Sequence, residues 1–126
     1  MKYCILSCAL LTLLFGAALL SARAVDDTVT QWCDTLSSAQ QSAQIGDWAQ
    51  AREYMDDAYA DWEARHIMLH LVSAHTDLDR SDVRFRRAAV FAHEGERAEF
   101  LAETSALIAQ LTNLRDAQAL SLRNIL

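Results

Sequence analysis

The stretch Gln44-Ile45-Gly46-Asp47-Trp48-Ala49-Gln50-Ala51 decides the fold of this chain, because it holds signals for the end of one helix and the start of the next. Gly46 suits the left-handed backbone that closes many helices. Asp47 can accept hydrogen bonds from the free N–H groups of a following helical turn. The stretch therefore predicts an αα-hairpin, two helices joined by a tight turn.

On both sides of this turn, apolar residues recur at spacings of three and four, the pattern of an amphipathic helix. Ahead of the turn, the N-cap candidates Asp26, Asp27 and Thr28 predict a helix that begins near them and ends at about Ala43. After it, a second helix carries an apolar stripe that we expect to broaden beyond Trp62 and to be most buried there. The stripes comprise Val29, Trp32, Leu36 and Ala43 in the first helix, and Trp48, Ala51, Met55, Ala58, Tyr59, Trp62 and Leu69 in the second, broadened by Ile67, Met68, Leu71 and Val72.

Gly95 repeats the signal of Gly46 and predicts the end of a third helix, followed by a fourth that begins around Glu96 and reaches about Leu122. The boundary between the second and third helices, within His75–Ser81, stays open. Because the chain has no proline and lacks strand patterns, we predict an all-α fold, an antiparallel helical bundle of three to four helices formed by residues 25–126. The apolar positions are Leu78, Phe85, Ala89 and Ala92 in the third helix and Leu101, Ile108, Leu111 and Leu114 in the fourth, widened by Phe100 and Leu107.

Residues 1–24 form an apolar leader with two interpretations. The small residues of Ala22-Arg23-Ala24 favour a signal peptide cleaved after Ala24. The apolar run from Tyr3 to Ala22 is also long enough to be kept as a membrane anchor. In both cases Lys2 stays in the cytoplasm and the rest is exported, to be membrane-anchored or secreted according to cleavage.

The chain beyond the leader is acidic. Since Lys2 and Arg23 lie in residues 1–24, nine basic residues remain against 17 acids, a net charge of −8. This charge argues against nucleic-acid binding and against electrostatic adhesion to anionic lipid, because both need basic patches.

Two kinds of charged group stand out locally. A basic group is either the solvated face of a helix or a docking site for headgroups or an acidic partner. Acidic pairs are expected on solvated helix faces. The basic group is Arg84, Arg86 and Arg87, and the acidic pairs are Asp56-Asp57 and Glu99/Glu103.

Cys33 is the one cysteine beyond the leader, because Cys4 and Cys8 lie within it. A lone cysteine cannot form an internal disulfide, so the domain must fold on packing. Cys33 is then either a small buried apolar residue or a site of intermolecular pairing.

The candidate chemistry of the chain is a single group on the second helix. Glu63, His66 and His70 share one helical face at spacings of three and four, so they could hold a divalent metal together with His75, His93 or Glu99. Hydrolase, phosphate-loop and covalent-haem motifs are absent from the sequence. We therefore expect no enzyme, assign no catalytic or cofactor-binding residue, and keep metal or small-ligand binding as the alternative function.

Several spaced residues resemble a bacterial family of short, membrane-associated helical proteins known only as a domain of unknown function. Its members begin with an apolar leader, carry an Asp-Trp helix start and a second Trp, then a His-x-acidic segment, and close on Asn-Ile-Leu. Asp77 stands where glutamate is expected. The resemblance implies architecture and location but no catalytic residue. It rests on Trp32, Leu36, Asp47-Trp48, Ala51, Trp62, His75, Asp77, Asp79, Ala102-Glu103 and the ending Ala119–Leu126.

These observations lead to a hypothesis of function. We expect a non-catalytic interaction module outside the cytoplasm, with an envelope or membrane protein as its partner and helix-in-groove contact as its mode of binding. If the leader is uncleaved, the N-terminal segment also contacts the membrane. Ile125 and Leu126 either dock on the bundle, which we favour, or are presented to a partner.

Overall fold

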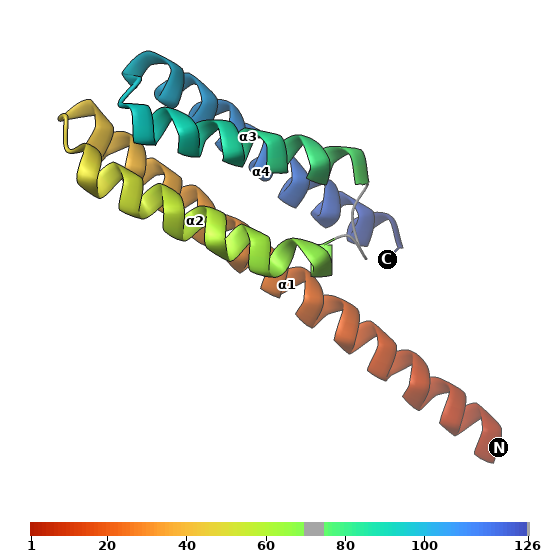
Figure 1. Cartoon of the computed structure of the whole chain (residues 1–126). Helices are drawn as coiled ribbons and strands as arrows, with labels where there is room; N and C mark the ends of the chain where they lie inside the picture. The colour runs from red at the N-terminus through yellow and green to blue at the C-terminus, as the bar shows by residue number, and fades with distance from the viewer. Residues whose placement is uncertain (70–74, 126) are drawn as a thin grey trace.

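The computed structural model describes residues 1–69 and 75–125, and within them it contains four α-helices. Each helix packs against two neighbours, in the cyclic order α1, α2, α3, α4. Figure 1 shows the arrangement as two antiparallel hairpins, α1 with α2 and α3 with α4. The predicted all-α antiparallel bundle is therefore confirmed. The helices are α1 (Lys2–Gln44), α2 (Trp48–Leu69), α3 (His75–Glu94) and α4 (Arg97–Ile125).

The two glycine turns are built as predicted. Gly46 and Gly95 both have positive φ, 80° and 70°, the conformation that favours glycine. The Asp47 carboxylate accepts a hydrogen bond of 3.2 Å from the backbone N–H of Gln50, as an N-cap does. We call this end of the bundle, residues 42–51 and 91–100, the turn end.

The predicted start of the first helix is wrong. α1 runs without interruption from Lys2 to Gln44, as Figure 1 shows. The Thr28 hydroxyl does not cap it, because it donates to the Ala24 carbonyl, 2.7 Å away, within the helix. Ala22 and Ala24 are good helix formers, so the chain offers nothing that would end a helix there. The predicted domain boundary after residue 24 thus falls inside one continuous helix.

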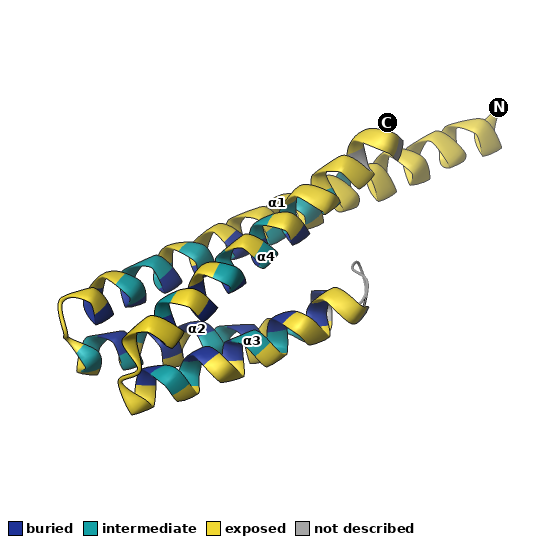
Figure 2. Ribbon diagram, turned by 90° about the horizontal axis from the view of Figure 1, so that it is seen from above, coloured by how far each residue is buried: buried dark blue, intermediate teal, exposed yellow. Residues whose placement is uncertain are grey.

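The centre of the core is aromatic. Trp32, Trp62 and Phe85 are all buried, with ring centroids 4.9 Å apart for Trp62 and Phe85 and 5.3 Å for the two tryptophans. Nearer the turn end, Trp48 meets Phe100 edge to face at 5.8 Å. In Figure 2 the buried residues follow the facing sides of the bundle helices. The tryptophans therefore join α1, α2 and α3 in one core.

Two predicted stripes need correction. In α4, Phe100 and Leu107 are fully buried, whereas Leu101 and Ile108 are only partly so, because the helix is rotated toward the first pair. In α2, Ile67 is 67% exposed, so the apolar face does not broaden there. Ile67 follows Trp62 by five residues, which turns it well away from the buried side of a 3.6-residue helix. The side chains of Met68, Leu71 and Val72 lie outside the described residues.

Both buried tryptophans donate their indole N–H to a carboxylate on the next helix. Trp32 donates to Asp61 at 2.6 Å, and Trp62 donates to Asp82 at 3.2 Å. Each aspartate is also paired with an arginine four residues on, Arg65 for Asp61 and Arg86 for Asp82. These contacts satisfy the one polar atom of each indole and fix the register of α1 on α2 and of α2 on α3.

Glu103 is buried, so its prediction as a solvated residue is wrong. Arg84 and Arg87 on α3 lie 3.3 Å and 3.7 Å from its carboxylate. Arg84 also donates to Gln110 on α4 at 2.8 Å. The predicted basic group thus has partners within the bundle. The other expected acidic residues, Glu99, Asp56 and Asp57, are exposed as predicted.

Cys33 is partly buried between α1 and α4. Its sulfur lies 4.0 Å from the Thr112 hydroxyl. Burial raises the pKa of the Cys33 thiol, which lowers its thiolate fraction at neutral pH. The partial burial agrees with the interpretation of Cys33 as a small packed residue, and intermolecular pairing stays the alternative hypothesis.

Candidate functional site

The most unusual surface of the molecule is the first part of α1. Its apolar residues extend beyond the bundle and are exposed, as the N-terminal half of the helix in Figure 2 shows. Among the described residues, α1 is the one helix that is long and apolar enough to cross a membrane. The most apolar 18-residue stretch of α1 is entirely unburied. A signal sequence meets the same criterion, so the choice between cleavage and retention stays a prediction.

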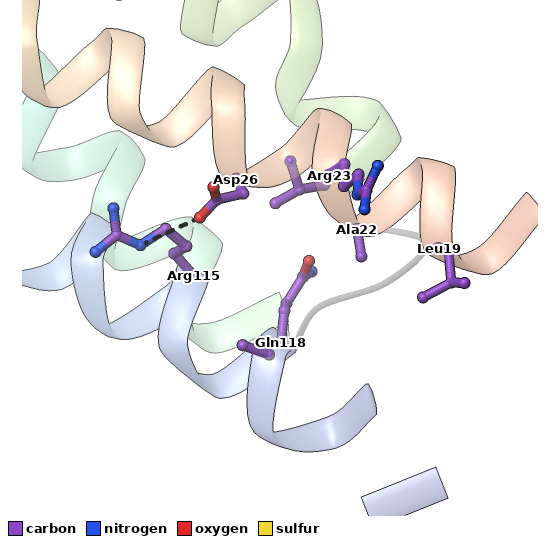
Figure 3. A pocket seen from close by; sticks show the side chains of 8 residues that line it. Leu19, Ala22, Arg23, Asp26, Arg115 and Gln118 are labelled. Carbon is purple, nitrogen blue, oxygen red and sulfur yellow. Dashed lines mark ion pairs between the residues drawn. The ribbon is translucent and has the colours of Figure 1, made fainter. Parts of the chain in front are cut away.

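α1 leaves the bundle beside the last part of α4. We call this the exit end, formed by residues 19–28 of α1, 65–69 of α2, 75–80 of α3 and 114–120 of α4. Arg115 of α4 lies 3.5 Å from the carboxylate of Asp26 on α1 and donates to Thr30 at 3.4 Å. Figure 3 shows this ion pair at the edge of a hollow of about 210 Å³, with Leu19 and Ala22 on one side and Gln118 on the other.

A second hollow, of about 190 Å³, lies on the α2 side of α1 at the same level. Ser21 and Ala24 line it from α1, and Arg65 and Leu69 line it from α2. Arg65 donates to the Thr28 hydroxyl at 3.3 Å across this contact. Residues of the predicted leader therefore form walls of the bundle on both sides of α1.

The surface of α3 and α4 carries two hollows that are both larger than the two at the exit end. One of about 550 Å³ and one of about 390 Å³ share Arg80 and Arg84 in their walls. We call this surface the α3–α4 groove. Its α4 wall combines small side chains with Gln110 and Leu114, and its α3 side carries the half-exposed Val83. The small residues are Ala106, Ala109, Asn113 and Ala117.

The predicted metal group is only partly described. The His66 ring nitrogen lies 2.9 Å from the Glu63 carbonyl, and the His66 ring stacks on Trp62. His70 and the side chain of His75 lie outside the described residues. Within the described part of the chain, no three His, Cys, Asp or Glu residues gather as metal ligands. Binding through Glu63, His66 and His70 stays a prediction.

The suggested completion of that group by His93 or Glu99 is wrong. His93 lies 3.1 Å from Asp56, ten residues and therefore about 15 Å along α2 from His66. Glu99 lies in the first turn of α4, at the same turn end. Both residues are thus too far from His66 to share an ion with it.

Two features of these surfaces were not predicted from the sequence, the Arg115–Asp26 contact at the exit end and the α4 wall of the α3–α4 groove. The Arg115–Asp26 contact joins residues far apart in the chain, and nothing in local spacing indicates it. The α4 wall of the groove did leave a signal, because Ala106, Ala109, Asn113 and Ala117 recur at spacings of three and four.

Comparison with protein families gives one match. Residues 19–125 match the family described as a domain of unknown function (DUF4363). The match covers most of the chain, and it begins within the apolar run. Comparisons with curated proteins and with solved structures give no match.

Proposed function

This chain belongs to the DUF4363 family, a domain of unknown function, and from that premise we propose that it is a membrane-anchored interaction module. Its bundle stands outside the cytoplasm and binds a helix of another envelope protein. It catalyses no reaction. The observation that carries the proposal is the continuity of α1, whose first half is exposed and apolar and whose second half is a wall of the bundle.

The length of the apolar run suits an anchor. At 1.5 Å per residue, the run from Tyr3 to Ala22 is about 30 Å long, the thickness of a hydrocarbon core. Lys2 on one side and Arg23 on the other then lie at the two interfaces. Because the same helix continues into the bundle without a flexible linker, the orientation of the anchor in the membrane also sets the orientation of the bundle.

Three observations favour retention of the leader over cleavage after Ala24. Leu19, Ala22 and Arg23 line the hollow against α4, and Ser21 and Ala24 line the hollow against α2. The shared family region begins at residue 19, so it includes residues that cleavage would remove. Cleavage would therefore strip one wall from the exit end of the bundle.

The α3–α4 groove is the surface that best suits a partner helix. Small side chains such as Ala106 and Ala109 let a second helix backbone approach closely, as they do between packed helices in membranes. Charges of both signs border the groove, the arginines Arg80, Arg84 and Arg87 and the acids Asp77, Asp79 and Glu103. A helix with a small or apolar face and flanks that carry both signs of charge would complement both features.

The proposal is tested with the full-length chain in bacterial cells. A photo-crosslinking residue replaces Ala109 in the groove, and the matched control replaces Ala60, which is exposed on α2. We expect the Ala109 variant to be cross-linked, in the membrane fraction, to one envelope protein that the Ala60 variant does not capture. Recovery of the chain from the soluble fraction, or equal cross-linking from both positions, would contradict the proposal.

A further inference from the structure

The end of α4 reaches past the bundle and runs beside the apolar part of α1. In an antiparallel pair, each step forward along α4 lies opposite one step back along α1. Arg115 lies opposite Asp26, so Ala119 lies level with Ala22 and Arg123 lies level with Ala18. Ala22 and Ala119 line the same hollow, which fits this register. Figure 1 shows the end of α4 near the point where α1 leaves the bundle.

The acidic residues of α1 and of α4 stop at the same height along the bundle. The first acidic residue of α1 is Asp26 and the last of α4 is Asp116, and both lie 3.5 Å from the Arg115 side chain. Beyond this level, the α4 sequence is Ala119-Leu120-Ser121-Leu122-Arg123-Asn124-Ile125, which contains no acid and a single cation. The level beyond which acidic residues are absent is thus shared by two helices that meet only in the folded bundle.

The described side chains in this segment are exposed. Leu120 is 57% exposed, and Ala119, Ser121, Arg123 and Asn124 are exposed as well. In water, an exposed leucine at the end of an amphipathic helix is unfavourable, whereas at a bilayer interface it is stabilising. The apolar run of α1 lies at the same height, so a bilayer that surrounds this run would also surround Leu120.

We propose that the C-terminal turns of α4, Ala119–Ile125, insert into the outer interface of the lipid bilayer next to α1. The segment is about 10 Å long, so, entering along the direction of α1, it reaches a depth comparable to that of helices bound at the interface. The Arg123 guanidinium then lies where it can extend to a lipid phosphate. This inference rests on the proposed function, because it requires that α1 be retained as an anchor.

A second point of attachment has a consequence for the bundle. A helix that crosses a membrane alone is free to rotate about its axis. With α4 also inserted, the tilt of the bundle is restricted and the same side of α1 always faces α4, so the α3–α4 groove keeps a constant angle to the membrane surface. A partner helix in the same membrane would then meet the groove in one orientation.

The experiment uses the full-length chain in phosphatidylcholine–phosphatidylglycerol vesicles. Cys4, Cys8 and Cys33 are replaced by serine, and a single cysteine carrying the fluorophore NBD is placed in turn by Leu120→Cys, Leu14→Cys and Ala102→Cys. All three positions are exposed, so labelling leaves the core intact. Lipids with a spin label on the acyl chain report contact with the hydrocarbon. Circular dichroism checks that each labelled protein keeps its helical content.

We expect the Leu120 label to emit at shorter wavelength than the Ala102 label and to be quenched by spin-labelled lipid, as the Leu14 label is, whereas the Ala102 label is not quenched. Quenching at Leu14 without quenching at Leu120 would overturn this inference and leave the anchor intact. Quenching at neither position would overturn the anchor itself. A blue-shifted Leu120 label that spin-labelled lipid does not quench would show that protein, such as a second copy of the chain, covers it, which also overturns the inference.

Discussion

The two ends of the bundle are held together in different ways. At the turn end, glycines with positive φ, an aspartate cap and the Trp48–Phe100 contact close the helices within a few residues of each other. At the exit end, α1 passes between two hollows and is joined to α4 by the partly exposed Arg115–Asp26 pair. The turn end is thus held by local turn and cap signals together with one aromatic contact, whereas the exit end depends entirely on contacts across the bundle and, in our account, on the surrounding lipid.

The largest effect is expected from the aromatic core, which lies between the two ends and supports both. Trp62→Ala removes a fully buried ring and the hydrogen bond to Asp82, so it should lower the free energy of unfolding by about 3–5 kcal/mol. Chemical unfolding of the full-length chain in detergent micelles measures this loss. Ile67→Ala is the matched control on the same helix, and its change should stay within about 0.5 kcal/mol because Ile67 is exposed. Similar losses for both would contradict the assigned core.

A smaller loss of stability is expected at the turn end. Gly95→Ala places a Cβ at a positive φ, which costs about 1–2 kcal/mol. The added methyl group itself meets Trp48 at 3.8 Å, an ordinary contact, so the cost comes from the backbone. Gly16→Ala is the control, since Gly16 is helical with open space around it, and it should not destabilise the chain. A neutral Gly95→Ala variant would show that the turn is not held in this conformation.

The α3–α4 contact comes next in size. Glu103→Gln removes the buried charge that Arg84 and Arg87 face, and we expect a loss of about 1 kcal/mol because both arginines are partly solvated. Glu99→Gln changes an exposed residue one turn earlier on the same helix and should have almost no effect. Thermal unfolding of both variants at neutral pH separates them. Equal stability would place Glu103 in solvent, as the sequence had suggested.

The smallest effect on stability is expected at the exit end. Arg115→Ala removes a partly exposed ion pair, so the free energy of unfolding should fall by less than about 1 kcal/mol. Hydrogen exchange of α4 residues beyond Arg115 should nevertheless become faster in detergent. In lipid vesicles this difference should shrink, because the bilayer holds the same segment. A large loss of stability would mean that the exit end is as firmly closed by protein contacts as the turn end.

The two ends of the bundle also differ in how far the sequence predicts them. Gly46, Asp47 and Gly95 act on their own neighbours, so the turns and the helix ends near them could be predicted from the sequence. The start of α1 could not, because Asp26 and Thr28 are ordinary N-cap residues whose actual partners, Arg115 and the Ala24 carbonyl, depend on the folded bundle and on an unbroken helix.

The same limit applies to the candidate site. The leader was visible as an apolar run, but its sequence is compatible with both cleavage and retention. The burial of Glu103 and the pairing of Arg84 and Arg87 with it depend on how α3 lies against α4, which helical spacing alone does not determine. The small residues in the groove wall could have been predicted in principle, since Ala106, Ala109 and Ala117 lie on one face at helical spacing.

The most direct test of the central claim, that α1 is at once an anchor and a wall of the bundle, is the intact mass of the protein purified from cell membranes. Our account predicts a protein that retains residues 1–24 and resists extraction with alkaline carbonate. A shorter chain that begins at Val25 and is released into the soluble fraction would contradict it.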